Sequence, residues 1–306
     1  GEQGDKSIVT VSSGKQDTDI FGNPVENTGD YAGAVIAESD GEFLIFTYAD
    51  AVRAADSINV RFSDGTKIAG TVRQIDEVLG MAVVAVPSGN LPEEERKKVQ
   101  VLSLANSYTV KAGDVLVGIG GPSGQGHSLS FGTVSYVARN VQITDGLTRI
   151  LYADISSNSQ TGTFLINTAG EMVGWTSESC RSESCTDRTA AYTISSYKPI
   201  LERLTNGASA AYLGILGQDV SRAMQGSGIP AGVYVTEAVS GSPAYDAGIQ
   251  PGDIIVKFGT KEIGSFKDLQ AQIENSASGV SVSVNVMRKG RDGYTEIPFL
   301  VSLRAR

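Results

Sequence analysis

Residues 242–255 of this chain read SPAYDAGIQPGDII, and this stretch decides the fold of the C-terminal third. Gly248 and Gly252 mark tight turns, because glycine adopts positive φ without the steric cost of a side chain. Pro251 and Gly252 then lead into the apolar run DIIVKF at 253–258, as in a turn that enters a strand. The stretch therefore predicts tight turns followed by a strand.

The residues around this stretch form further short elements. Strand-like runs stand at 214–216 and 232–235, and a helix is predicted near 266–275. Residues 280–286 read VSVSVNV, which is the alternation of a half-exposed strand. Residues 208–306, at about 100 residues, are enough for a compact domain of mixed β and α structure.

A helix marks the start of this domain. Residues 196–205 gather apolar side chains on one helical face. Asn206 and Gly207 end the helix, since glycine commonly follows a helix terminus. We therefore expect a separate N-terminal domain to end at residue 207.

The region from 31 to 207 reads as a series of short strands. Its β-type runs, separated by Gly, Asn and Asp, stand at 34–37, 42–46, 58–62, 81–86, 115–119 and 171–175. Residues 1–30 are polar and lack strand or helix periodicity, so we expect them to form an extended lead-in. The chain has 36 glycines and only 9 prolines, which favours many brief strands joined by tight turns. The fold class is therefore mainly β.

Charge and composition exclude several classes of partner. The 306 residues carry a formal net charge of -9, so neither nucleic acid nor an anionic lipid surface is an expected partner. No apolar run reaches the about 18 residues that a membrane-spanning helix needs. The sequence begins at Gly1 without an initiator methionine, so we expect any membrane attachment to come from an N-terminal anchor absent from it. No cofactor is expected.

The two cysteines, Cys180 and Cys185, lie in the polar stretch SESCRSESCT at 177–186. Their spacing permits a small-loop disulfide, which would point to an oxidising, extracytoplasmic setting. Two free surface thiols are the alternative. A metal site is not expected, because two sulfurs and one distant histidine do not complete a four-ligand zinc shell.

Two motifs of the C-terminal region resemble the PDZ domain of HtrA proteases. The stretch 242–255 is similar to the family's most specific signature, and YLGI at 212–215 is similar to its carboxylate-binding loop. Successive backbone amides near Gly214 could hold a terminal carboxylate. The resemblance implies a peptide groove between the strand at 233–235 and the helix that contains Leu269 and Ile273, although these apolar residues equally fit a core. The residues so assigned to peptide binding are Tyr212, Leu213, Gly214, Ile215, Val233, Tyr234, Val235, Leu269 and Ile273.

Residues 31–207 resemble the trypsin-like double β-barrel of the same family. Residues 120–135, GGPSGQGHSLSFGTVS, follow the family's Gly-Asn-Pro, Gly-Leu-Gly and Thr-x-Gly-x-Val-Ser segment. Residues 167–174, NTAGEMVG, follow the hairpin after its nucleophile loop. The resemblance thus implies a trypsin-like double β-barrel followed by a PDZ domain.

The three positions that carry the chemistry in the family hold other residues here. The family's strand ends in Ile-Leu-Thr-Asn, one variable residue and histidine, whereas this chain reads IFTYAD up to Asp50. Gly80 stands where the family has the aspartate that orients the base. Thr161, within SQTGTFL at 159–165, takes the place of the nucleophilic serine, and Ser159 is the fallback nucleophile.

These replacements predict a loss of proteolysis. A hydroxyl is a weak nucleophile until an adjacent base accepts its proton, and Asp50, with a reference pKa of ~3.9, is too weak a base. The one histidine, His127, falls in the glycine-rich segment instead of at the base position. Ser159 and Thr163 also replace glycines of the oxyanion hole, whose donors are each worth ~2.7 to 4 kcal/mol. No lysine lies near Ser159 or Thr161 in the sequence.

Two functions from different classes remain. The leading hypothesis is an extracytoplasmic pseudoprotease scaffold, whose PDZ groove takes C-terminal or unfolded segments of other polypeptides as an added strand. The alternative is an active serine endopeptidase of protein quality control with a rearranged site. A metal in the vacated cleft, held by Asp50 and nearby carboxylates, has no ligand cluster to recommend it. The resemblance further implies a homotrimer and a membrane tether.

Overall fold

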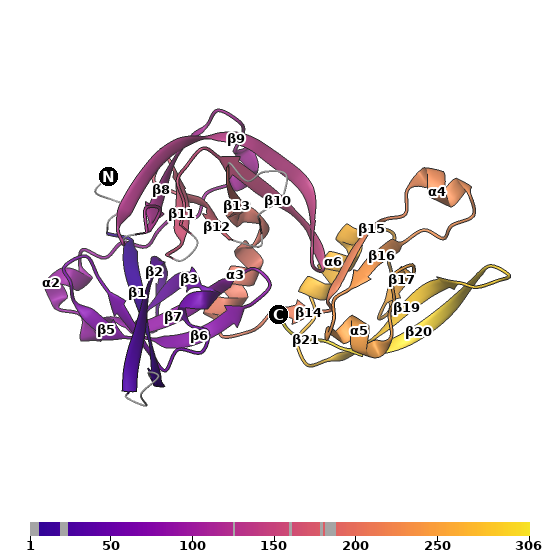
Figure 1. Cartoon of the computed structure of the whole chain (residues 1–306), viewed down its shortest axis with the longest axis horizontal. Coiled ribbons are helices and arrows are strands. Elements are labelled where there is room, and N and C mark those ends of the chain that lie inside the picture. Colours follow the sequence, from indigo (N-terminus) through magenta and orange to yellow (C-terminus); the bar gives the residue numbers. More distant parts are fainter. Residues whose placement is uncertain (1–5, 19–23, 125, 159–160, 178–179, 181–187) are drawn as a thin grey trace. The chain divides into compact units, whose positions relative to one another are not determined.

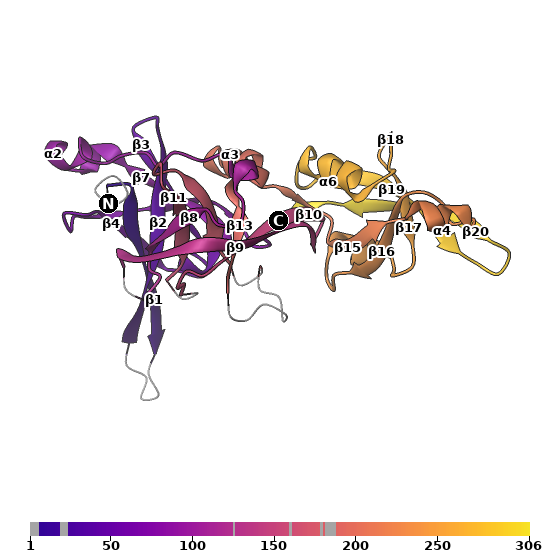
Figure 2. The same cartoon turned by 90° about the horizontal axis from the view of Figure 1, so that it is seen from above.

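The chain folds into two compact units (Figures 1 and 2). The computed structural model describes residues 6–18, 24–124, 126–158, 161–177, 180 and 188–306. Unit 1 consists of Gly1–Arg139 and Arg149–Ala208, and unit 2 of Asn140–Thr148 and Ser209–Arg306. The predicted boundary at residue 207 lies next to the point where the chain passes for the last time from unit 1 to unit 2, between Ala208 and Ser209. The sequence did not predict that residues 140–148 belong to unit 2.

Unit 1 begins with a seven-stranded sheet of strand order β5-β4-β1-β2-β3-β7-β6. Its strands are β1 (Ile8–Thr18), β2 (Pro24–Ser39), β3 (Glu42–Tyr48), β4 (Ser57–Arg61), β5 (Lys67–Ala69), β6 (Thr71–Asp76) and β7 (Met81–Pro87). The edge strands β5 and β6 are separated in sequence only by Gly70, so the sheet curls until its two edges meet. A Cβ at Gly70 would lie 2.6 Å from Val84, so glycine fits this bend.

The prediction of an extended lead-in was wrong, because β1 and β2 are integral strands of this sheet. Val11 lies opposite Tyr31 on β2 and opposite Val60 on β4. The four successive residues Ile8, Val9, Thr10 and Val11 are all buried. Both faces of this part of β1 are therefore covered, which removes the alternation by which a strand is recognised in a sequence.

The second half of unit 1 is a closed six-stranded barrel of order β10-β13-β12-β11-β8-β9. Its strands are β8 (Val115–Gly120), β9 (Ser128–Ile143), β10 (Gly146–Ala153), β11 (Thr163–Asn167), β12 (Met172–Thr176) and β13 (Thr189–Thr193). Short helical elements of the unit are η1 (Ala49–Ala51), η2 (Ser88–Asn90), α2 (Glu93–Arg96), η3 (Ser107–Thr109), η5 (Ile194–Ser196) and α3 (Lys198–Thr205). The apolar face predicted for the helix at 196–205 is buried in α3.

Unit 2 contains a sheet of order β15-β16-β17-β19-β20, with β18 paired to β17, and a separate pair of β14 and β21. The strands are β14 (Ala211–Tyr212), β15 (Ile215–Asp219), β16 (Val233–Ala238), β17 (Ile254–Phe258), β18 (Lys261–Glu262), β19 (Ser281–Lys289), β20 (Tyr294–Ser302) and β21 (Arg304–Ala305). The helices are α4 (Arg222–Gly226), α5 (Pro243–Ala247) and α6 (Phe266–Glu274). Mainly β structure is therefore confirmed.

The stretch 242–255 builds α5 and the turn into β17. The Ser242 hydroxyl accepts a hydrogen bond from the Tyr245 amide at 3.2 Å and caps the helix. Gly248 ends the helix at a φ of 94°, a conformation that favours glycine. The turns predicted at Gly248 and before β17 are thus confirmed.

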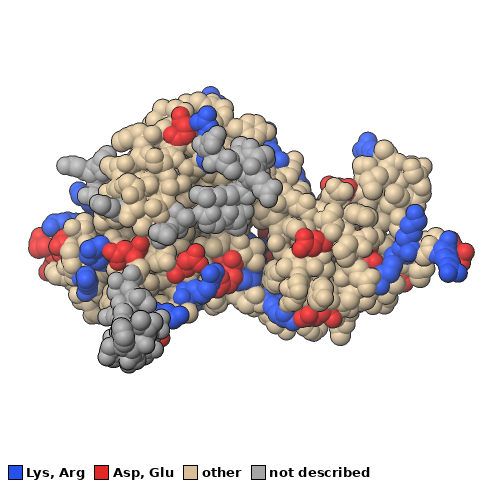
Figure 3. Space-filling view, in the orientation of Figure 1, with Lys and Arg blue, Asp and Glu red and all other residues tan. Residues whose placement is uncertain are grey.

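The surface carries charges of both signs. On the face drawn in Figure 3, Lys and Arg side chains are interspersed with Asp and Glu. In the part of the chain that the structure describes, no helix has the length and apolar character of a membrane span.

Candidate functional site

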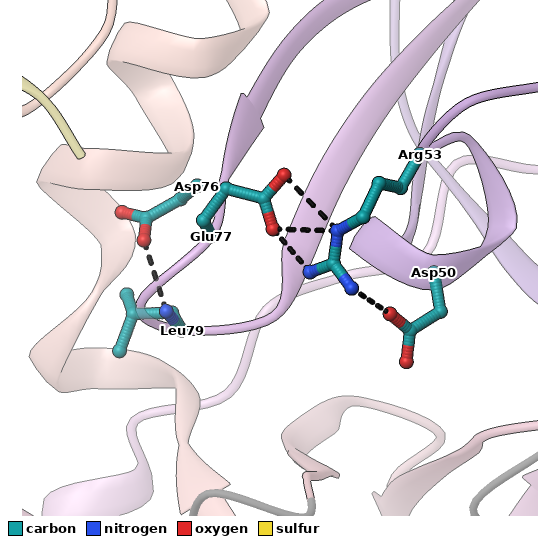
Figure 4. Close-up of polar contacts among 5 residues, drawn as sticks. All are labelled: Asp50, Arg53, Asp76, Glu77 and Leu79. Carbon is teal, nitrogen blue, oxygen red and sulfur yellow. Dashed lines mark hydrogen bonds and ion pairs between the residues drawn. The ribbon is translucent and has the colours of Figure 1, made fainter.

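The position of the family's general base lies just beyond β3. Asp50 belongs to the single turn η1, and its side chain is exposed. Its Oδ1 accepts a hydrogen bond from Arg53 Nη1 at 2.7 Å, and Arg53 Nε donates to Glu77 Oε2 at 3.0 Å (Figure 4). Asp50 is therefore an exposed carboxylate of a surface ion-pair group, in which it shares the Arg53 guanidinium with Glu77, and it is not a buried base.

Gly80 lies beside that position, as the resemblance implies. Its carbonyl accepts a hydrogen bond from the Ala49 amide at 3.0 Å. The buried carboxylate of Asp76 accepts a hydrogen bond from the Leu79 amide at 2.9 Å, and Figure 4 shows it turned away from Arg53 and Asp50. Asp76 thus shapes the turn between β6 and β7, while Gly80 has no side chain with which to orient a base.

The hydroxyl of Thr161 is directed at the backbone. Its Oγ1 donates to the Gly121 carbonyl at 2.5 Å, and the Thr161 carbonyl accepts from the Ala32 amide at 2.6 Å. A hydroxyl nucleophile must pass its proton to a base, and a peptide carbonyl is not a base of useful strength. Ser159, the fallback nucleophile, lies outside the described residues.

Tyr48 fills the space beside the nucleophile loop, which the sequence did not predict. Its hydroxyl donates to the Thr163 carbonyl at 2.9 Å and accepts from the Thr163 amide at 2.8 Å. A Cβ on Gly162 would lie 2.1 Å from the Tyr48 ring. Burial raises the pKa of Tyr48, so the phenol stays protonated and serves as a structural bridge between β3 and β11.

An aromatic cluster ties the first sheet of unit 1 to its closed barrel. The ring of Phe46 on β3 lies 5.4 Å from Phe164 on β11 and 5.3 Å from Trp175 on β12, measured between centroids. Trp175 in turn lies 5.4 Å from Tyr192 and from Tyr197. Ring contacts between β3 of the first sheet and β11 and β12 of the barrel therefore join the two halves of unit 1.

The remaining reactive side chains of unit 1 lie elsewhere. His127 Nε2 is 3.3 Å from Thr10 Oγ1, a contact with β1. Cys180 is buried, and burial raises the pKa of its thiol; none of the described residues forms a disulfide with it. Its predicted partner Cys185 lies outside the described residues, so the disulfide stays a prediction. Within the described ranges, no group of three or more His, Cys, Asp and Glu side chains could hold a metal.

In unit 2, the predicted carboxylate-binding loop holds a carboxylate, that of Asp145. The Leu213 amide donates to Asp145 Oδ2 at 2.8 Å. The amides of Gly214 and Ile215 donate to Oδ1 at 2.8 and 2.9 Å. Burial raises the pKa of Asp145, whereas these amides and the charge of Arg306 lower it. Three successive N–H groups converging on one carboxylate form an anion-binding nest.

The shape of this loop is set by α5 and its N-cap. Gly214 has a φ of 86°, and a Cβ there would lie 2.1 Å from the Ser242 Cβ. The Ser242 hydroxyl donates to the Gly214 carbonyl at 3.1 Å, and the Ala244 amide donates to the Leu213 carbonyl at 2.9 Å. The two matched motifs, 212–215 and 242–255, therefore meet in one site and hold the amides in position.

The groove strand was assigned incorrectly from the sequence. The strand at 233–235 belongs to β16, which is paired on both edges, with β15 and with β17. Among the described strands, β15 and β20 are the edges of this sheet, and β15 is joined to α6 where Asp219 Oδ1 accepts from the Phe266 amide at 2.6 Å. Six of the nine predicted peptide-binding residues are core residues with at most 1% exposure: Leu213, Ile215, Val233, Val235, Leu269 and Ile273. Tyr234 and Tyr212 are half-buried.

Asp145 was missed because its role depends on a contact between residues 68 to 70 positions apart. A local signal existed, since Asp145 precedes Gly146 between two strands, and Asp-Gly is a strong hairpin signal. That signal predicts a turn but says nothing of where the turn binds.

Comparisons with known proteins agree with this architecture. Residues 32–174 match the trypsin-like peptidase domain, and residues 211–298 match the PDZ domain. The chain is 30% identical over 283 residues to a probable periplasmic serine endoprotease, DegP-like, of Hahella chejuensis, covering 89% of this chain and 58% of the relative. It is 30% identical over 270 residues to the putative serine protease HhoB of a Synechocystis species, covering 83% of this chain and 62% of the relative. The chain thus spans about three fifths of the length of these relatives.

A solved structure shares the whole fold. The HtrA-type protease AlgW, solved with a decapeptide, superposes with a TM-score of 0.67 at 18% identity, covering 99% of this chain and 97% of that one. At this identity the likeness concerns the fold. The two domain matches, the similarity to these relatives and the shared fold agree with one another. This chain is an HtrA-like protein, with a trypsin-like peptidase domain followed by a PDZ domain.

Proposed function

We propose that this chain is a non-catalytic HtrA-like protein that binds the C-terminal or unfolded segments of other polypeptides through its PDZ domain. The observation that carries the non-catalytic part is the set of contacts that the residues at the three triad positions make. The Thr161 hydroxyl donates a hydrogen bond to the Gly121 carbonyl, Asp50 is paired with Arg53, and Gly80 has no side chain. A hydroxyl without an adjacent base has no route for its proton during attack.

The binding part rests on the loop at 212–215 and on the free edge of β15. Three amides already hold a carboxylate in this loop, which is the chemistry by which the terminal carboxylate of a polypeptide is recognised. The free edge of β15 offers backbone groups to an added strand. The protease AlgW, which shares this fold, was solved with a decapeptide, and this is consistent with such a use of the fold.

The alternative function is a serine endopeptidase with a rearranged site. The relatives are described as serine endoproteases, which favours this alternative by analogy. The contacts of Thr161 and Asp50 argue against it. The periplasmic relatives support an extracytoplasmic location for this chain, and a homotrimer and a membrane anchor remain proposals from the family resemblance.

Recognition of a terminal carboxylate can be tested with two peptide pools. One is a fluorescein-labelled decapeptide pool with a C-terminal Leu and a free carboxylate, and the other is the same pool with amidated ends. We expect the free-carboxylate pool to bind at least about tenfold more tightly in fluorescence anisotropy, because an amide end leaves buried amides without an anionic partner. Equal affinity for the two pools would contradict binding through this loop.

A further inference from the structure

The tip of the β9–β10 hairpin presents the PDZ loop with the same groups as the end of a polypeptide chain. Asp145 supplies a carboxylate to the amides of residues 213–215. The Asp145 amide donates to the Ile215 carbonyl at 2.9 Å, as the backbone of an added strand would. Leu147 packs against the buried core cluster of unit 2, as an apolar terminal side chain would.

The site around Asp145 is closed and built for one anion. Asp145 is only 3% exposed, and the buried residue Arg306 contributes a favourable charge. A buried carboxylate is tolerated only when it is hydrogen-bonded or paired; here the loop supplies three hydrogen bonds, and Arg306 supplies an opposite charge. The same three amides cannot also serve a second carboxylate, so a terminal carboxylate and Asp145 exclude each other.

The hairpin tip is shaped for this contact by its turn. Strand β9 ends at Ile143 and β10 begins at Gly146, which leaves a two-residue loop. Asp145 has a φ of 64°, a conformation that Asp, Asn and Gly tolerate better than other residues. On the far side of the turn, the Leu147 amide donates to Gln270 Oε1 of α6 at 3.0 Å. Strand β15, loop 213–215 and helix α6 therefore all hold the tip.

We propose that residues 140–148 are an internal ligand of the PDZ domain, which must leave the carboxylate-binding loop before the C-terminus of another polypeptide can bind there. This inference rests on the proposed binding function and adds its regulation. The chain crosses between the units on both sides of this segment, after residues 139 and 148. Displacement by a partner polypeptide therefore frees the end of a hairpin that starts in the peptidase-like unit.

The test is to remove the carboxylate while keeping the turn. Asp145→Asn and Asp145→Gly both accept a positive φ, and neither supplies an anion to the loop. The matched controls are Asp40→Asn and Asp40→Gly, because Asp40 is exposed, has a φ of 53° and precedes a glycine in another hairpin. For a natural chain in which Asp145 is out of the loop 213–215 in 1 to 10% of molecules, the Asp145 variants bind the free-carboxylate pool about 10- to 100-fold more tightly than the natural chain. The Asp40 variants bind like the natural chain.

Hydrogen exchange of the full chain gives a second, peptide-free readout. The amides of residues 213–215 are expected to exchange faster in Asp145→Gly than in the natural chain and in Asp40→Gly, because they lose their acceptor. Unchanged peptide affinity together with unchanged exchange in folded Asp145 variants would overturn the internal ligand. A different outcome is faster exchange of the amides of residues 213–215 in Asp145→Gly, with no binding of either peptide pool by any variant. That outcome would support the contact between Asp145 and the loop but refute the proposed polypeptide-binding function.

Discussion

Incubated with unfolded casein for a day, the natural chain is expected to leave the casein intact, to the same extent as a Thr161→Ala variant. The reason lies in the contacts of the three triad positions, where the Thr161 hydroxyl donates to Gly121 and Asp50 is paired with Arg53. Loss of a working triad lowers kcat of a serine protease by about 10⁶-fold. Mass spectrometry of the casein fragments measures the difference against buffer alone.

Restoring the family's three triad residues alone is expected to produce little proteolytic activity. In a variant with Asp50→His, Gly80→Asp and Thr161→Ser, Tyr48 still fills the space beside Gly162, and Ser159 and Thr163 still replace the family's glycines. The loss of one oxyanion donor costs about 10²- to 10³-fold in kcat. The triple variant should therefore remain at least about 100-fold below an active relative. Cleavage by the natural chain that disappears in Thr161→Ala would refute the whole prediction.

The second large effect is expected at Trp175. This side chain is completely buried, with the rings of Phe46, Tyr192 and Tyr197 within 5.4 Å between centroids. Truncation of a fully buried large aromatic side chain costs ~3–5 kcal/mol of unfolding free energy, since the cavity that it leaves collapses only in part. Trp175→Ala is therefore expected to lower the stability of unit 1 by that amount, measured by urea unfolding followed with circular dichroism.

Phe131 supplies the matched control for this experiment. It is an aromatic residue of the same barrel but is 69% exposed on β9. Phe131→Ala is expected to change the unfolding free energy by no more than about 0.5 kcal/mol. Equal effects of Trp175→Ala and Phe131→Ala would show that the aromatic cluster does not hold the two halves of unit 1 together.

Features encoded locally could be predicted from the sequence. The helix expected at 266–275 is α6 (Phe266–Glu274), because its apolar residues repeat with a helical period. The strand expected at 81–86 is β7 (Met81–Pro87), a run of buried apolar residues. The turn residues around α5 also followed directly from the preferences of Ser, Pro and Gly.

Features that depend on distant contacts could not be predicted. The residues 8–11 of β1 are buried on both faces and show no alternation, so they were taken for a lead-in. The groove strand was placed at 233–235 from the family resemblance alone, whereas the strand order, which only the fold determines, puts β15 at an edge of the sheet and β16 inside it. The roles of Tyr48 and Asp145 come from partners 115 and about 70 residues away.

The most direct test of the central claim is the reactivity of the natural chain with a fluorophosphonate, followed by intact-mass spectrometry. This reagent reports an activated hydroxyl without depending on the choice of polypeptide substrate. Because the Thr161 hydroxyl donates to the Gly121 carbonyl and not to a base, we expect the mass to stay unchanged, while an active serine protease under the same conditions gains one label. Stoichiometric labelling that maps to Thr161 or Ser159 would contradict the non-catalytic account.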